Sequence, residues 1–133
     1  MTEHVYTGKQ ILITMPNKVG LLSNITTVIM SLGINIEGVS ASASGEQAQI
    51  MIVTEDNRTA IEALRTKGYV VKEDDVVMME LEDDPGTLED ACSRLAAENI
   101  DIKYIYGTSC PSGCPAQLVI NTSNNTKAMS ILK

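Results

Sequence analysis

Apolar residues along the first half of the chain follow two different periods, and each period predicts a different element. Residues 10–15 alternate and are rich in isoleucine, which predicts a strand. Apolar positions at helical spacing predict a helix over residues 21–32, and Gly33 is placed to end it. Residues 34–43 and 48–54 predict two further strands joined by a hairpin turn.

A second helix and a fourth strand complete this first set. Residues 57–67 are predicted to be helical because Asp56 can cap the helix start and Gly68 can end it. Residues 69–72 then predict a fourth strand. The order strand, helix, strand, strand, helix, strand is typical of the ferredoxin-like fold, in which both helices cover one face of an antiparallel sheet.

The same pattern occurs a second time, which indicates an internal duplication. The first part of the repeat recurs 66 positions later, and after a two-residue insertion near residue 112 the offset becomes 68. A single identity between the two halves could arise by chance. A series of identities in the same order, interrupted by one small gap, indicates duplication. The matched pairs include Gly20 with Gly86, Leu22 with Leu88, Ile36 with Ile102, Thr54 with Thr122 and Asn57 with Asn125.

We therefore predict an α+β protein of two tandem ferredoxin-like units, residues 9–75 and residues 76–133. The second unit stops before a counterpart of the fourth strand, so the edge of its first strand, residues 76–81, is expected to be bare. A bare edge invites pairing with another chain. The first helix of the second unit is expected to use Asp84 as its cap and Pro85 in its first turn.

Composition and charge exclude several classes of partner. The chain has 10 Lys and Arg against 17 Asp and Glu, a net charge of −7, which argues against nucleic acid and against anionic membranes. It has no Trp and no Phe, so it lacks base-stacking platforms. Apolar residues make up 44% of the chain, enough for a packed core.

Few residues are available for catalysis or for cofactor chemistry. The single histidine, His4, lies in the N-terminal tail, and we expect no catalytic residue, no metal and no cofactor. No apolar run is long enough for a membrane span, and no signal segment is evident. Three cysteines fit a reducing compartment, so we expect a cytoplasmic protein.

Two loops of the repeat resemble those of the ACT domain family. The family pattern is an Asn or Asp, then x-Pro-Gly-x-Leu, a helix, and Gly-Ile-Asn-Ile. Residues 17–22, Asn-Lys-Val-Gly-Leu-Leu, and residues 33–36, Gly-Ile-Asn-Ile, match it, although Val19 replaces the usual proline. Residues 83–88 and 99–102 match it again. The chain is most similar to small proteins made of two tandem ACT domains.

The resemblance implies a regulatory module that binds an amino acid and controls an enzyme of amino-acid metabolism. In members of this family that are similar to phosphoglycerate dehydrogenase, the loop after the first strand and an Asn at the start of the second strand hold the ligand between domains. The implied ligand site is Asn17, Lys18, Val19, Gly20, Leu21, Leu22, Asn35 and Ile36, and a possible second site is Asp83, Asp84, Gly86, Thr87, Leu88 and Asp101.

The chemistry of the first loop supports this assignment independently. A strand-to-helix junction offers free backbone N–H groups and a dipole that favour a carboxylate. Gly20 allows close approach, and the carboxamides of Asn17 and Asn35 can accept from an ammonium group or donate to a carboxylate. In the second repeat Asp83 and Asp101 would repel a carboxylate, so the first repeat is expected to be the better site.

The sequence thus predicts a non-catalytic, amino-acid-binding regulatory protein, a homodimer that passes the binding event to a partner enzyme. One alternative is a ligand-independent regulatory or assembly subunit that docks through the strand at residues 76–81. A less favoured alternative is a thiol redox sensor that uses Cys110 and Cys114, although residues 107–115 hold no basic residue to stabilise a thiolate. A plain hairpin turn is the favoured interpretation of these cysteines.

Overall fold

The computed structural model describes residues 2–82, 86–108 and 115–133. Its elements follow the predicted order twice, with four helices and six strands in these residues. The strands form one sheet in the order β2-β3-β1-β4-β6-β5. The α+β class and the tandem ferredoxin-like organisation are therefore confirmed. The bounds are β1 Thr2–Pro16, α1 Leu21–Ser31, β2 Ile36–Ser44, β3 Gln47–Thr54, α2 Asn57–Thr66, β4 Val71–Leu81, α3 Thr87–Ala97, β5 Ile102–Thr108, β6 Ala116–Thr122 and α4 Asn125–Leu132.

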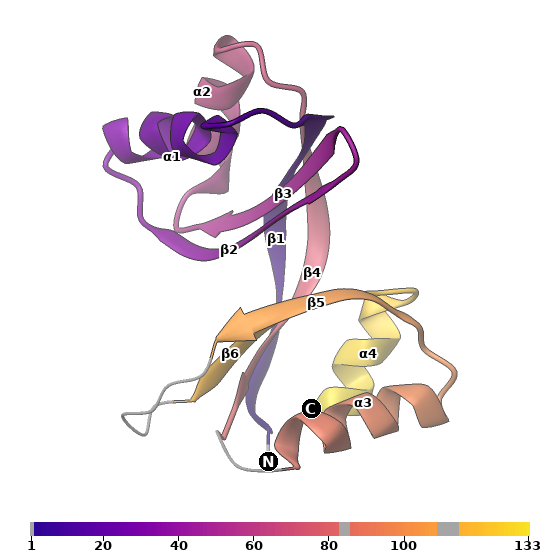
Figure 1. The fold of residues 1–133 in the computed structure, drawn as a ribbon. Helices are drawn as coiled ribbons and strands as arrows, with labels where there is room; N and C mark the ends of the chain where they lie inside the picture. The colour runs from indigo at the N-terminus through magenta and orange to yellow at the C-terminus, as the bar shows by residue number, and fades with distance from the viewer. Residues whose placement is uncertain (1, 83–85, 109–114) are drawn as a thin grey trace. The chain divides into compact units, whose positions relative to one another are not determined.

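Contacts divide the chain into two compact units. The first unit is Lys9–Asp74, and the second unit joins Met1–Gly8 to Asp75–Lys133. In each unit the two helices cover one face of the strands, as Figure 1 shows for α1 with α2 and for α3 with α4. Each unit has its own apolar core: Ile13, Ile25 and Leu64 are fully buried in the first, and Met79 and Leu132 in the second.

The N-terminal residues form a strand that the sequence patterns did not predict. β1 extends back to Thr2, and Val5 packs into the core of the second unit with Val77 and Met79. The strand at residues 76–81 lies in β4, which has β1 on one side and β6 on the other. The expectation that this edge is bare is therefore wrong, because residues 2–8 occupy the place of the missing fourth strand.

The start of the second helix is built in the same way in both units. The Asn57 carboxamide oxygen accepts from the backbone N–H of Thr54 at 2.9 Å and from its hydroxyl at 2.8 Å, and the amide nitrogen donates to the Lys9 carbonyl at 2.9 Å. Asn125 makes the same bonds to Thr122 and to the Asp75 carbonyl, at 2.9, 2.8 and 3.0 Å. Each Asn thus fastens its helix to the first strand of its own unit.

The predicted helix signals have mixed outcomes. Asp56 caps α2 as expected, because its carboxylate accepts from the Thr59 backbone N–H at 3.2 Å. The first helix of the second unit is capped by Gly86 instead of Asp84, and α3 begins at Thr87. Gly86 has φ +92°, a left-handed conformation that favours glycine and matches Gly20 at φ +85° before α1. The two glycines therefore mark equivalent helix entrances.

Candidate functional site

The loop before α1 folds into a tight helix entrance. The backbone N–H of Asn17 donates to the Glu46 carbonyl at 2.7 Å, which ties the loop to the hairpin of β2 and β3. The Leu21 side chain is buried in the core, and the Leu21 backbone N–H donates to the Lys18 carbonyl at 3.2 Å. The Val19 side chain is fully exposed. Of the residues predicted in this loop, Leu21 is therefore engaged within the fold, and Val19 is open to solvent.

The two helix entrances differ in charge. Gly20 caps α1 without a side-chain hydrogen bond, and the first turn of α1 carries no acidic residue. Gly86 caps α3 in the same way, but the first turn of α3 carries Glu89 and Asp90. Acidic side chains in the first turn compensate the positive end of the helix dipole. The α1 entrance is therefore the one left more favourable for an anion.

Asn35 is held at the start of β2 by two backbone hydrogen bonds to one residue. Its N–H donates to a carboxylate oxygen of Glu55 at 3.0 Å, and its carbonyl accepts from the Glu55 N–H at 3.2 Å. Within the described part of the chain, the exposed carboxamide of Asn35 makes no hydrogen bond of its own. The backbone is therefore fixed while the polar side chain stays available.

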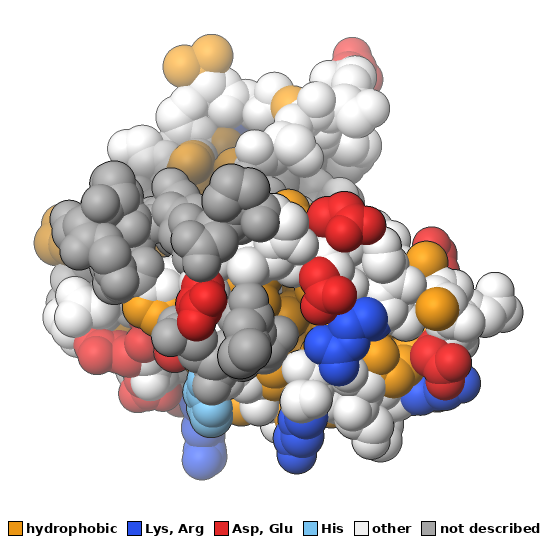
Figure 2. Space-filling model, turned by 90° about the horizontal axis from the view of Figure 1, so that it is seen from below, with side chains coloured by type: hydrophobic (Ala, Val, Ile, Leu, Met, Phe, Trp, Pro, Cys, Tyr) orange, Lys and Arg blue, Asp and Glu red, His pale blue; other side chains and the backbone are white. Residues whose placement is uncertain are grey.

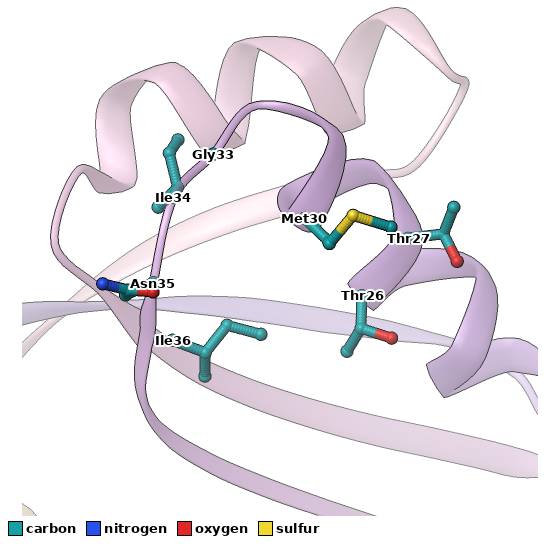
Figure 3. Close-up of a pocket in the computed structure, with 7 residues that line it drawn as sticks. All are labelled: Thr26, Thr27, Met30, Gly33, Ile34, Asn35 and Ile36. Carbon is teal, nitrogen blue, oxygen red and sulfur yellow. The ribbon is translucent and has the colours of Figure 1, made fainter.

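A cavity of about 560 Å³, open to solvent and lined mostly by exposed residues, lies between α1 and the beginning of β2. In Figure 3 the side chains of Met30 and Ile36 face the space between the helix and the strand, and Asn35 lies at one side of it. This volume is within the range of small-molecule sites. The residues that line it are Thr26, Thr27, Met30, Gly33, Ile34, Asn35 and Ile36.

Hydrogen bonds within α1 already engage the hydroxyl groups at the cavity. Thr26 donates to the Leu22 carbonyl at 2.9 Å, and Thr27 donates to the Ser23 carbonyl at 2.7 Å. Asn35 therefore contributes the side-chain donor that is not already used inside the described chain. The lining is otherwise apolar or backbone, and no charged side chain belongs to it.

The cavity brings together some of the predicted site residues and not others. Asn35 and Ile36 line it, whereas the loop at residues 17–22 does not. The sequence analysis missed Thr26, Thr27 and Met30 because it considered mainly the core-facing residues of this helix. Their signal is periodic: Thr26 and Met30 lie one and two turns after Leu22, on the side of the helix that faces β2.

The second repeat places different chemistry at the equivalent positions. The Asp101 backbone N–H donates to the Ser123 hydroxyl at 3.0 Å, and its carbonyl accepts from the Ser123 N–H at 2.9 Å. Gly86, Thr87 and Leu88 form the α3 entrance, where the Thr87 hydroxyl donates to the Glu82 carbonyl at 2.8 Å. The other predicted residues of this half, Asp83, Asp84, Cys110 and Cys114, lie outside the described residues.

Charges elsewhere suggest no second kind of site in the described residues. On the face drawn in Figure 2, acidic and basic side chains of these residues are interspersed. Nowhere in residues 2–82, 86–108 and 115–133 do three His, Cys, Asp or Glu side chains gather in a way that could hold a metal ion. Among the helices of these residues, none is both long and apolar enough to span a bilayer.

Comparisons with known proteins place this geometry in a family. A family model described as an ACT domain pair matches residues 6–133. A crystal structure of a protein from Bacteroides thetaiotaomicron is similar at 27% identity, with a TM-score of 0.88, over 96% of this chain and 88% of that one. No curated protein matches the chain.

Two more distant structures share the fold. The ligand-free regulatory subunit of aspartate kinase from Thermus thermophilus is 14% identical, with a TM-score of 0.68, over 96% of this chain and 93% of that one. The regulatory subunit of aspartate kinase from Thermus flavus is 16% identical, with a TM-score of 0.62, over 98% and 95%.

Proposed function

The chain belongs to the ACT domain family as an ACT domain pair, and from that premise we propose that it is a non-catalytic regulatory protein that binds a small amino acid. Asn35 at the side of the cavity between α1 and β2 carries the proposal. A carboxamide can accept from the ligand's ammonium group through its oxygen and donate to the carboxylate through its nitrogen. The free carboxamide beside an apolar cavity thus suits a zwitterion with an apolar side chain.

The ligand's carboxylate and ammonium group must be held at the same end of the site, because both are bonded to one α-carbon. The loop at residues 17–22 does not line this cavity, which lies beside the C-terminal half of α1, so we assign the carboxylate to the Asn35 amide nitrogen. In the proposed mode the ligand's apolar side chain lies against Met30 and Ile36.

Regulation follows if ligand binding favours one arrangement of the protein over another. A ligand shifts an equilibrium only by its difference in affinity for the two states. We propose that the favoured state is read by a partner enzyme of amino-acid metabolism and that the protein acts as a homodimer. The fold that the chain shares with the regulatory subunits of aspartate kinase from Thermus thermophilus and Thermus flavus supports a regulatory role.

The experiment is a thermal-unfolding scan against the twenty amino acids. At about 100 times its Kd a ligand adds about 2.7 kcal/mol to the free energy of unfolding, which raises Tm by roughly 10 °C in a chain of this size. We expect the shift to be lost in Asn35→Ala and kept in Asp101→Ala, the matched variant in the second repeat. A shift that persists in Asn35→Ala, or no shift with any amino acid, would contradict the proposal.

A further inference from the structure

Glu55 stands beside the cavity because of its hydrogen bonds to Asn35. One carboxylate oxygen accepts from the Asn35 N–H at 3.0 Å, and the Glu55 N–H returns a bond to the Asn35 carbonyl at 3.2 Å. Asn35 itself lines the cavity. The pair of bonds fixes a negative charge next to the residue that we propose as the ligand's polar contact, and the second carboxylate oxygen remains able to accept.

The cavity lining has no charge of its own. Its seven residues are threonine, methionine, glycine, isoleucine and asparagine, and none is ionised. A ligand with a protonated amine therefore finds no counter-charge among the described residues of the lining itself. Among the residues hydrogen-bonded to the lining side chains and backbone of this cavity, Glu55 supplies that charge.

In the second repeat the equivalent pair is Asp101 with Ser123, so the carboxylate belongs to the residue that corresponds to Asn35. There Ser123 takes the place of Glu55 and accepts from the Asp101 N–H at 3.0 Å, so the backbone arrangement does not require an acid at this position. A hydroxyl serves equally well as the acceptor. The charge of Glu55 is thus not explained by the hydrogen bond that it makes.

We propose that the Glu55 carboxylate binds the α-ammonium group of the amino acid and makes a protonated amine a requirement of this site. The inference rests on the proposed function, and it adds the residue that supplies the counter-charge and makes the ligand's protonated amine obligatory. The ligand class is amino acids with a free amino group and an uncharged aliphatic side chain. Ionised partners strengthen a hydrogen bond roughly twofold over neutral ones.

The test uses L-leucine as the probe and titration calorimetry on the full chain. Glu55→Gln keeps the acceptor for the Asn35 N–H and removes only the charge. We expect L-leucine to bind this variant at least about tenfold more weakly than the unchanged chain. N-acetyl-L-leucine and 4-methylpentanoate, which lack the protonated amine, are expected not to bind the unchanged chain.

Glu62→Gln is the matched control, because it removes one acid from the same unit at an exposed site on α2. It should leave L-leucine affinity unchanged. Equal binding by Glu55→Gln and the unchanged chain, with loss in Asn35→Ala, would overturn the inference and leave the proposed function standing. If neither L-leucine nor any other amino acid binds the unchanged chain, the proposed function fails and this inference fails with it.

Discussion

Asn57 and Asn125 show how single residues hold each unit together. Each carboxamide makes three hydrogen bonds that join a strand end, a helix start and the first strand of the unit. The sequence analysis matched these two residues as a pair but gave them no role. Their role is not readable from spacing alone, because the acceptor carbonyls of Lys9 and Asp75 lie far away in the sequence.

Replacing Asn57 by Ala is therefore expected to lower the free energy of unfolding by about 1–3 kcal/mol, since it removes the acceptor of the Thr54 N–H and hydroxyl. Urea denaturation measures the change. The neighbouring exposed variant Arg58→Ala should stay within about 0.5 kcal/mol of the unchanged chain. Equal effects for the two variants would contradict the role given to Asn57.

Tyr106 makes the stability depend on alkaline pH. Burial raises the pKa of its hydroxyl to about 12, above its ordinary value of 10.0. Below pH 10 the hydroxyl is protonated in both states and its contribution is fully present. As the pH rises from 10 to about 12, the unfolded state loses the proton first, so the free energy of unfolding falls.

An ultraviolet titration of tyrosinate should accordingly show one of the four tyrosines ionising near pH 12, and this step should vanish in Tyr106→Phe. The variant should also lose less stability than the unchanged chain as the pH is raised past 10. A titration in which Tyr106→Phe removes an ordinary step near pH 10 would show that the hydroxyl is not buried as described.

At the scale of elements, local sequence signals were enough to predict most of the helices and strands. Asp56 and Gly68 mark the ends of α2 because a cap and a left-handed residue depend only on near neighbours. The N-terminal strand was missed because Val5 is the one buried apolar residue among residues 4–8, and the partner strand lies some 70 residues away. β4 likewise runs without a break through Glu73, Asp74 and Asp75, across the boundary expected between residues 75 and 76, because strand pairing overrides local propensity.

A substitution at Val5 can test whether the N-terminal strand packs into the core of the second unit. Its side chain is 8% exposed in the core of that unit. Val5→Ala is expected to lower the free energy of unfolding by about 2 kcal/mol, through lost burial and the cavity left behind. Thr7→Ala, at an exposed position of the same strand, should cost much less. An equally small effect at both positions in urea denaturation would mean that the strand is not docked.

Gly107 tests the pairing of β5 with β6. A Cβ at this position would clash with the Gln117 backbone carbonyl oxygen, and backbone cannot move away as a flexible side chain can. Gly107→Ala should therefore separate this end of β5 from β6 and speed amide exchange there. Lys103→Ala, exposed on the same strand, is the control. Unchanged exchange in both variants would contradict the close approach.

At the scale of the whole molecule, duplication gave two similar units whose equivalent positions differ in charge. The first repeat has Asn35 with Glu55 and an α1 entrance free of acids, whereas the second has Asp101 with Ser123 and an acidic α3 entrance. The amide-versus-acid difference could be read from the sequence. The cavity itself could not, because it depends on how closely the outer face of α1 approaches β2.

This asymmetry predicts one amino-acid site per chain. When an amino acid that stabilises the chain is titrated into the protein, calorimetry should therefore give a stoichiometry near one ligand per chain. Asp101→Ala should not change that number, and Asn35→Ala should abolish the heat of binding. Two equal sites per chain would mean that the second repeat binds as well as the first.

The most direct test follows backbone amide resonances while the amino acid that stabilises the chain is added. We expect the shifts to concentrate at residues 26–36, around the cavity, with smaller ones at Glu55, and we expect no response at the equivalent residues 92–102 of the second repeat. Shifts centred on residues 92–102, or bound ligand without any response at residues 26–36, would contradict this expectation.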